Sequence, residues 1–454
     1  DMGQLEASEA GNTDVMVFHG STDAPTVDVA EPFEQLTLVD NLSYGSFTGE
    51  YLNLATSDYQ LQIQDEFGSK AVAQFGAPLE TLGLEDSALV VVASGFLDST
   101  VNNNGPAFGL YAALPSGGEM VELPAGDVSQ AMVQVIHNSA DAAASTVDVW
   151  LNDEPLLDDF AFRTASPFVP LTAGTNLDVS IQPSSSTDTV DALAKFSYQL
   201  LPDEKYVLMA SGLVSSSGYD PVEPFDIDVF QGARTEASQG GNTDVLVYHG
   251  ATDAPIVDIY ESSVPAGTLV DNLAYGAYSE DYLELSTDNY VLDVQDESGS
   301  TTVAQYEANL SDLGLADSAL VTLASGFLEP GNNSDGPAFG LFVALPSGGD
   351  LVELPEYEAP TALDDRLSEL TRMRIYPNPV SSELIIDVHN DARSPVTVEL
   401  YNVMGQKMPT PFDKRQLKGH HVLRYDVSSL AEGLYFVILS DGDSRMTRKI
   451  KVIK

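Results

Sequence analysis

Two stretches of the chain combine one histidine with two aspartates at the same spacing, and metal binding is the chemistry that such residues could serve. Mixed imidazole and carboxylate ligands bind zinc and other transition metals. A structural role competes with this interpretation, because an Asp before Ala-Pro forms a turn with its own backbone. Proton transfer by His would need a substrate pocket, and nothing in the sequence marks one. The candidate ligands are His19, Asp23 and Asp28, and His249, Asp253 and Asp258.

Two later loops, residues 98–105 and 329–336, are rich in side-chain oxygens. Calcium favours loops of this composition, although neither loop has the spacing of an EF-hand. Plain Asn/Gly turns would give the same composition. The candidate ligands are Asp98, Asn102 and Asn104, and Asn332, Asn333 and Asp335. The chain therefore requires no cofactor, and calcium is the ion that these loops would accept.

An Ala-Ser-Gly triplet follows an apolar run three times, at Ser94, Ser211 and Ser325. A nucleophilic Ser would need a Gly-x-Ser-x-Gly elbow that opens a helix, and strand or loop follows here instead. A bulge or crossover, where Gly lets two backbones approach, explains the triplets better. We therefore expect a protein that is not an enzyme, with no catalytic residues.

These candidates lie in internal repeats, and repeats decide the architecture. Residues 12–124 align with 242–355, and a looser copy at 130–234 retains the opening motif with His137 and Asp148. In that middle copy Ala143 and Ala144 stand where the other copies complete Asp-Ala-Pro. This difference argues against one shared geometry in all three copies.

Each copy has the pattern of strands separated by turns. Val15 and Val17 alternate with Met16 and Phe18, so residues 15–18 are apolar on both sides, as in an inner strand. Gln60, Gln62 and Gln64 alternate with apolar residues, which predicts a half-buried strand. Clusters of Gly, Pro, Asn and Asp recur at intervals of roughly ten residues, which favours an all-β chain of tandem immunoglobulin-like sandwiches.

The predicted domains follow from this pattern. Three sandwiches come first, and we name them repeat A (1–125), the divergent repeat B (126–238) and repeat A′ (239–355). A linker is expected at 356–372, and a different small β-sandwich at 373–454.

Charge and composition exclude several classes of partner. The 454 residues contain no Cys and carry a net charge of −50. Such a surface repels phosphate backbones and anionic lipids, so nucleic-acid binding is not expected. No apolar run approaches the ~20 residues of a membrane helix, so membrane insertion is not expected either. The first residues lack a basic and an apolar region, so an exported form would have lost its signal peptide.

The last eighty residues carry a distinctive set of motifs. They open with Tyr-Pro-Asn-Pro at 376–379, continue through Leu-Tyr-Asn-Val-Met-Gly-Gln at 400–406 and Gly-Leu-Tyr at 433–435, and end in a basic strand. This region resembles the type A C-terminal sorting domain of the type IX secretion system. The residues that carry the resemblance are Tyr376, Pro377, Asn378, Pro379, Gly405, Gly433, Tyr435, Lys449 and Lys451.

That resemblance implies a seven-stranded sandwich that is recognised by an outer-membrane translocon and shuttle. It also implies a sortase-like peptidase as a partner and a location outside the cell or on the outer membrane of a Gram-negative bacterium. The repeats themselves resemble the bacterial domain of unknown function numbered 4397, through Val-x-Val-x-His, Asp-Ala-Pro and Val-Asp at 15–29 and 245–259. That family implies an extracellular β-sandwich without an established activity.

We therefore expect a secreted structural or adhesive surface protein that is capable of self-association. An extracellular module for glycans or ions, with calcium-stabilised loops, is the alternative. A hydrolase is less favoured, because no nucleophile and base recur at a suitable spacing.

Overall fold

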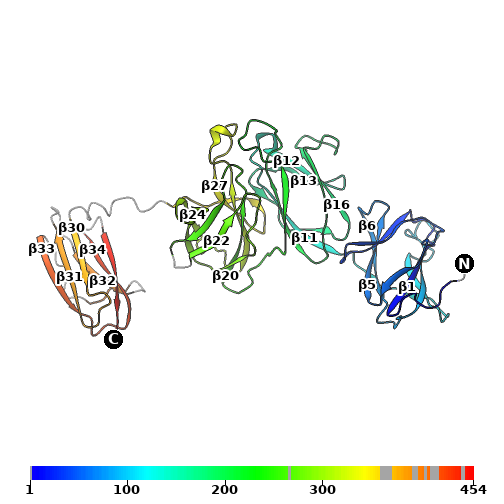
Figure 1. The fold of residues 1–454 in the computed structure, drawn as a ribbon, viewed down its shortest axis with the longest axis horizontal. Helices are drawn as coiled ribbons and strands as arrows, with labels where there is room; N and C mark the ends of the chain where they lie inside the picture. The colour runs from blue at the N-terminus through cyan, green and yellow to red at the C-terminus, as the bar shows by residue number, and fades with distance from the viewer. Residues whose placement is uncertain are drawn as a thin grey trace. The chain divides into compact units, whose positions relative to one another are not determined.

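The computed structural model describes residues 3–263, 267–357, 371–390, 397–402, 406–409, 419–440 and 445–454. The chain divides into two compact units, Asp1–Glu356 and Tyr357–Lys454. Regular structure among the described residues consists of β-strands and two short 3-10 turns, η1 (Ala142–Ala144) and η2 (Pro330–Asn332) (Figure 1). The all-β prediction is therefore confirmed.

Repeat A is a sandwich of two five-stranded sheets. In spatial order, the first sheet contains β4 (Leu52–Ala55), β1 (Asn12–His19), β7 (Ala88–Ser94), β8 (Gly109–Ala113) and β9 (Val121–Glu122). The second contains β10 (Ala125–Gly126), β6 (Ala71–Pro78), β5 (Asp58–Asp65), β2 (Val27–Glu31) and β3 (Leu36–Leu42). Strand β1 is an inner strand, as predicted, because it pairs with β4 and, in parallel, with β7.

Alternation along β1 decides which side chains enter the core. Val15 and Val17 are buried between the two sheets of repeat A. Met16 and Phe18 point to the other face of the first sheet and are only half-buried. The sequence made both faces of this strand apolar, and repeat A itself covers only one of them.

Repeats B and A′ follow the same plan. The first sheet of repeat B contains β19 (Asp226–Gln231), β18 (Lys205–Ser211), β11 (Gln130–His137), β14 (Thr164–Ala165) and β28 (Gly349–Asp350), with β15 (Val169–Thr172) also on β11. Its second sheet contains β13 (Glu154–Ala161), β12 (Thr146–Leu151), β16 (Asn176–Pro183) and β17 (Ala194–Gln199). In repeat A′ the sheets are β23 (Leu283–Ser286), β20 (Asn242–His249), β26 (Ser318–Ser325), β27 (Gly340–Ala344) and β29 (Val352–Glu353), and β22 (Gly267–Leu273), β21 (Val257–Glu261), β24 (Asn289–Asp296) and β25 (Thr302–Asn309).

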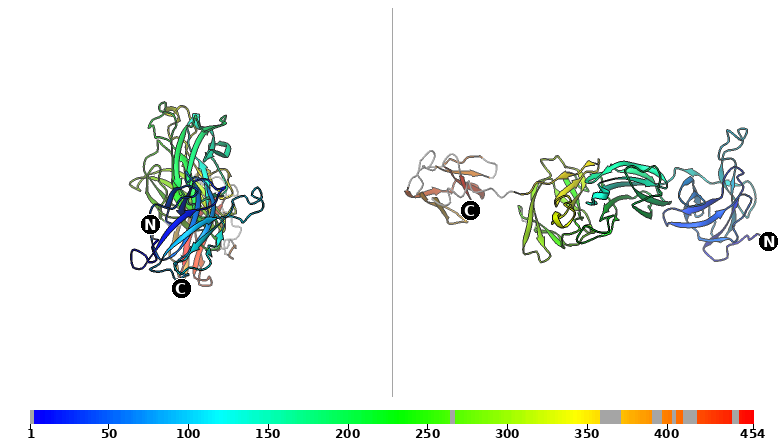
Figure 2. Two further views of the ribbon diagram at one scale, coloured as in Figure 1. Left: turned by 90° about the vertical axis from the view of Figure 1, so that its right-hand side faces the viewer. Right: turned by 90° about the horizontal axis from the view of Figure 1, so that it is seen from above.

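Repeats B and A′ share an apolar core. The first sheets of both repeats contribute to one buried cluster, which includes Met209 from repeat B and Leu246 and Leu323 from repeat A′. Figure 2 shows the two repeats adjoining, in green and yellow-green. Strand β28 of repeat A′ also pairs with β14 of repeat B, through Ala165 and Gly349. The two repeats are therefore joined by both side chains and main chain.

Repeat A meets repeat B through polar groups. Gln62 Nε2 donates to the carbonyl of Ala173 at 2.9 Å, and Gln64 Nε2 donates to the carbonyl of Gly174 at 2.7 Å. Both glutamines are buried. The sequence predicted a half-buried strand here, and these side chains are covered because repeat B supplies the acceptors for their amide groups.

The second compact unit forms two three-stranded sheets from its described residues. One contains β30 (Thr371–Tyr376), β31 (Glu383–Asn390) and β33 (Gly419–Asp426), and the other contains β32 (Thr397–Asn402), β34 (Gly433–Ser440) and β35 (Arg445–Val452). Val388, Leu400, Val437 and Ile450 lie in its buried core. The described residues thus supply six of the seven strands that the resemblance implied.

Candidate functional site

The histidine at the end of the first strand of each repeat holds the following turn. In all three repeats Nε2 lies within hydrogen-bonding distance of a backbone carbonyl, and because a carbonyl only accepts, Nε2 carries the proton. The pairs are His19 with Pro25 at 2.9 Å, His137 with Ala144 at 2.7 Å and His249 with Pro255 at 2.9 Å. Burial lowers the pKa of His249, and it lowers the pKa of His137 to about 4. These two imidazoles are therefore neutral near pH 7.

The second aspartate of the motif caps a β-bulge. Asp28 Oδ1 accepts from the backbone N–H of Asn41 at 2.7 Å, where the register between β2 and β3 shifts. Asn41 has φ of 52°, a conformation that Asn and Asp tolerate better than most residues. The same bond joins Asp148 to Asp159 and Asp258 to Asn272. This aspartate fixes the bend of the strand beside it.

The first aspartate organises the oxygen-rich loop. Asp23 accepts from the backbone N–H groups of Leu97 and Asp98 and from Nδ2 of Asn102, at 2.9, 3.1 and 3.0 Å. Burial opposes ionisation of Asp23, but these N–H donors lower its pKa overall. The carboxylate is thus already engaged by the loop that the sequence assigned to calcium.

Repeat A′ repeats this loop arrangement. Asp253 accepts from Leu328 N, Glu329 N and Asn333 Nδ2 at 2.8, 2.8 and 3.0 Å. The other candidate calcium ligands lie around the same turn. Asp98 accepts from Thr100, Asn332 ends η2, and Asn104 and Asp335 adopt positive φ. The first aspartate of the predicted metal set and the predicted calcium loop therefore belong to one hydrogen-bonded loop in repeat A and in repeat A′.

The predicted metal ligands do not converge. Among the described parts of the chain, no three His, Asp or Glu side chains form a group that could hold a metal ion. His19 faces the turn before β2, Asp23 faces the loop after β7, and Asp28 faces β3. The motif places its three polar groups on three different backbone segments.

The middle repeat preserves this geometry despite its different sequence. Asp141 takes the place of Asp23 and accepts from Ser215 N at 2.6 Å and from the hydroxyl of Tyr219 at 3.0 Å. The 3-10 turn η1 supplies the carbonyl that His137 needs. The middle copy thus keeps the bond from the histidine to a backbone carbonyl, with a one-turn helix in place of the Asp-Ala-Pro turn, although the partners of its first aspartate differ.

The Ala-Ser-Gly triplets mark close backbone contacts, as the sequence indicated. Gly95 has φ of +88°, and a Cβ atom there would lie 2.2 Å from the carbonyl oxygen of Ala107. Gly212 and Gly326 have the same restriction, against Pro224 and Ala338. Any side chain at these positions would collide with main chain, so the glycines are needed for the fold.

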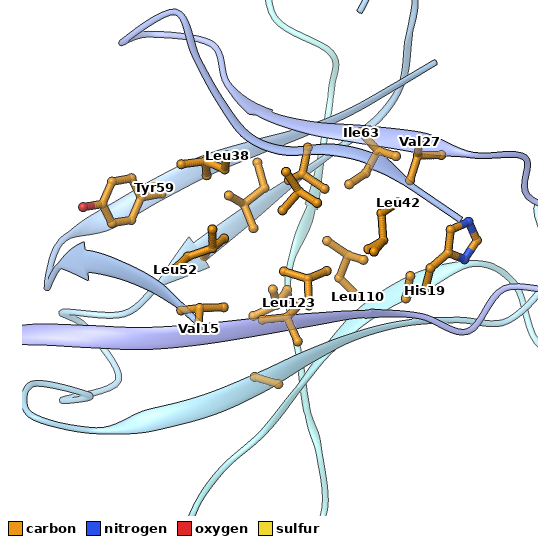
Figure 3. Close-up of a pocket in the computed structure, with 18 of the residues that line it drawn as sticks. Val15, His19, Val27, Leu38, Leu42, Leu52, Tyr59, Ile63, Leu110 and Leu123 are labelled. Atoms are coloured by element: carbon orange, nitrogen blue, oxygen red, sulfur yellow. The ribbon is translucent and has the colours of Figure 1, made fainter. Parts of the chain in front are cut away.

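The interior of repeat A is apolar. Figure 3 shows the hollow between its two sheets, with Val15, Leu42 and Leu110 among the labelled side chains that line it. His19 lies at one end of this hollow, and its Nδ1 is buried without a hydrogen-bond partner. The lining has the character of a sandwich core.

The motif at 376–379 is tied to the last strand. Asn378 Nδ2 donates to the Lys449 carbonyl at 3.0 Å, and Lys451 N donates to Asn378 Oδ1 at 2.8 Å. The peptide bonds before Pro377 and Pro379 are cis. Tyr435 is buried in β34, and its hydroxyl donates to the carbonyl of Ala431 at 3.0 Å. Tyr376 is exposed, Gly433 begins β34, and Gly405 lies outside the described residues. Most of the predicted sorting residues are thus joined in one region of the second unit.

The residues that join repeats B and A′ were not expected from the sequence. Arg163 donates to Ser325 Oγ and to the carbonyl of Ala338, and its guanidinium lies 3.9 Å above the ring of Phe342. Arg234 pairs with Asp244 at 2.7 Å. A signal was present, since these are the only two arginines in residues 1–355 of a strongly acidic chain.

Comparison with known families gives two matches. Residues 131–260 match a domain of unknown function, DUF4397, and residues 374–454 match the secretion system C-terminal sorting domain. A comparison with curated proteins gave no match. None of the described segments forms a helix with the length and apolar character needed to cross a bilayer.

Three solved structures show a distant likeness to this chain. The dimeric latent PorU from Porphyromonas gingivalis is 10% identical with a TM-score of 0.15, and the match covers 95% of this chain and 34% of that one. Two ligand-free structures of PulA from Klebsiella pneumoniae, one of them the G680L mutant, are each 11% identical with TM-scores of 0.13, covering 71% of this chain and 31% of theirs. The chain thus spans about a third of the length of these proteins.

The sorting domain indicates export by the type IX secretion system, to the cell surface or the extracellular space. Its presence implies interaction with that secretion machinery. This chain therefore carries a DUF4397 domain at residues 131–260 and a type IX secretion system C-terminal sorting domain at residues 374–454.

Proposed function

We propose that this protein is a non-enzymatic structural or adhesive component of the bacterial surface. The sandwich repeats provide a stable, acidic body, and the C-terminal domain directs its export. The observation that carries the proposal is the threefold recurrence of the same backbone bonds from His and both Asp residues of the opening motif.

The chemistry of these bonds favours a structural role. A general base must reach a substrate proton, whereas Nε2 of His137 and of His249 faces a carbonyl at 2.7 and 2.9 Å. The carboxylate of Asp23 receives N–H groups from its loop, which leaves it poorly placed to bind calcium. The polar residues of the motif therefore stabilise turns, and a surface scaffold requires stable turns.

The export part of the proposal is tested on intact cells of a bacterium that has a type IX system. The full chain is compared with a variant carrying Lys449→Glu and Lys451→Glu in its last strand, and with Lys70→Glu as a charge control in repeat A. Immunogold labelling should decorate the surface for the full chain and the control. The label should be lost for the sorting variant, because the two substitutions remove the net positive charge of the last strand.

The structural role is tested on labelled surface material and on the purified full chain. Negative-stain images of labelled surface material should show rods, sheets or fibres. Thermal unfolding should be unchanged by calcium, zinc or glycans. Esterase, protease or glycosidase turnover that disappears in a folded His249→Ala variant would contradict the proposal, and stabilisation by calcium or a glycan would favour a binding module instead.

A further inference from the structure

The contact between repeats B and A′ joins equivalent positions of the two repeats. Asn138 and Gly250 each follow the motif histidine, so they occupy the same position in their repeats. Asn138 Nδ2 donates to the carbonyl of Gly250 at 3.2 Å, and a Cβ atom on Gly250 would lie 2.0 Å from that nitrogen. Equivalent positions meet each other only near a two-fold axis.

A second pair of contacts obeys the same relation. Arg163 and Gly276 are equivalent, because each donates its N–H to the carbonyl of the motif histidine at 2.8 Å. Phe342 and Asp228 are also equivalent, each on the strand that follows the Ala-Ser-Gly triplet. Arg163 lies over Phe342, and in the opposite direction Gly276 approaches the Asp228 carboxylate, with its Cβ position at 3.9 Å. The interface is thus an internal pseudo-two-fold contact between like sheet faces.

Repeat A presents the same sheet face, and that face is only partly covered, with four of the six members named below half-buried and two exposed. Its members are aromatic or aliphatic at the positions where repeat A′ places buried or partly buried aromatic and aliphatic side chains. Phe18 corresponds to Tyr248, Phe47 to Tyr278, Val90 to Val321, Val92 to Leu323, Tyr111 to Phe342 and Met120 to Leu351. Met120 is 50% exposed where Leu351 is 8% exposed, and Phe47 is 54% exposed. We call the repeat A members of this set the A face.

The A face has the backbone features that the two-fold contact uses. Gly45 donates its N–H to the carbonyl of His19 at 2.8 Å, as Arg163 and Gly276 do to their histidines. Gly20 occupies the position of Asn138 and Gly250, next to the axis. With no side chain at position 20, two copies of this face can approach closely at that point.

Chemistry selects a second A face as the occupant. Repeat B offers the Asp228 carboxylate, which receives the hydroxyl of Tyr248 at 2.6 Å. Repeat A has Phe18 at that position, so docking on a B-type face would leave a buried carboxylate without this donor. In a contact between two A faces, the aromatic and aliphatic side chains of one copy would instead pack against those of the other. We propose that two copies of this chain dimerise through their A faces, with the two-fold geometry that relates repeats B and A′. This inference is independent of the surface role proposed above.

Charge sets the conditions for the dimer. Residues 1–125 contain 19 Asp and Glu, a single Lys and no Arg. Two such repeats repel each other, and at 0.1 M salt this repulsion is largely screened between charges more than about 10 Å apart. Dimerisation should therefore strengthen as the salt concentration rises.

The test is the molar mass of the full chain, measured by light scattering on a sizing column over a range of protein and salt concentrations. The chain mass is 48.4 kDa, and the wild type should approach twice that value. Phe47→Glu and Met120→Glu each place a carboxylate on the A face and should weaken dimerisation at least about tenfold. Both side chains are half-exposed in the single chain, so folding should survive, as circular dichroism would verify. Val101→Glu, in an exposed loop of the same repeat, is the matched control and should remain dimeric.

A wild type that stays at the single-chain mass in all conditions would overturn the proposal. A dimer that neither face variant weakens would also overturn it, because the contact would then lie elsewhere. Dissociation of Val101→Glu to the same extent as the face variants would do so too, since added charge alone would then explain the effect.

Discussion

The two contacts of repeat B with its neighbours are built from different chemistry. Toward repeat A′ it contributes to a shared apolar cluster with Met209 and Val207 fully buried. Toward repeat A it offers backbone carbonyls to the amide groups of Gln62 and Gln64. The apolar contact removes hydrocarbon from water, which stabilises the fold by about 25 cal/mol per Å² of buried apolar surface. Each hydrogen bond from a glutamine amide group replaces a hydrogen bond to water and contributes only about 1 kcal/mol.

This difference implies two levels of coupling. Repeats B and A′ should unfold together, because neither sheet face can be uncovered without exposing the shared cluster. Repeat A should unfold separately, since its own core lies within one sandwich and its junction with repeat B fixes orientation more than stability. The same polar junction leaves the A face free.

The largest expected effect comes from Val321→Ala, which removes two methyl groups from the shared cluster. We expect a loss of about 2–3 kcal/mol. Trp150 is the only Trp and lies in repeat B, so its fluorescence during urea unfolding reports on the neighbouring repeat. The midpoint should fall although the substitution lies in repeat A′.

Val90→Ala is the matched control for this change, because it is the same substitution at the equivalent, half-buried position of repeat A. At concentrations where the chain is a monomer, the Trp150 midpoint should not move. Equal shifts for the two variants would show that all three repeats unfold as one unit.

A smaller effect is expected at the polar junction from Gln64→Ala. The carbonyl of Gly174 would lose its donor, at a cost of about 1 kcal/mol. Hydrogen exchange of residues 173–176 should rise about fivefold, while exchange in the cluster shared by repeats B and A′ stays the same. Gln60→Ala, on the same strand, is the control. Faster exchange throughout repeat A′ in Gln64→Ala would argue against the proposed separation.

The smallest effect concerns Asp228 in the contact between repeats B and A′. Burial is the main cause that raises the pKa of Asp228 above 3.8, and hydrogen bonds from Tyr248 and Ser211 partly offset this by lowering it. A raised pKa in the folded state stabilises the protein below the unfolded pKa, and this stability is lost as pH rises through the folded value. Asp228→Asn has no such loss, so the variant should gain stability relative to the wild type as the pH rises above 3.8. A difference that does not change with pH, measured by urea unfolding of Trp150, would show that Asp228 does not titrate in this way.

Local sequence patterns were enough to predict the sandwiches and the meaning of several motifs. Alternation in residues 15–18 identified an inner strand, and Gly in the Ala-Ser-Gly triplets indicated close backbone approach. Both are consequences of bonds and sterics within a few residues or one strand pair. The motif at 376–379 indicated the sorting domain in a different way, through its resemblance to a known family.

The partners of the polar motif residues could not be read from the sequence, because those partners come from distant segments. His19 and Asp23 are four residues apart, yet one faces Pro25 and the other faces Leu97. Proximity in sequence suggested a shared ligand set, and the turn between them directs the two side chains to different backbones. Repeat B showed the converse, because η1 restored the acceptor for His137 without the expected turn sequence.

Residues 15–18 are all apolar, so the sequence alone indicates that the first strand of repeat A has two apolar faces. Which of these faces is covered depends on how whole domains pack. In repeat A′ the outer face is buried by repeat B, through a contact whose two halves are related by a pseudo-two-fold axis. In repeat A the corresponding face is only partly covered, because burial depends on the relative placement of whole domains, which no local pattern encodes.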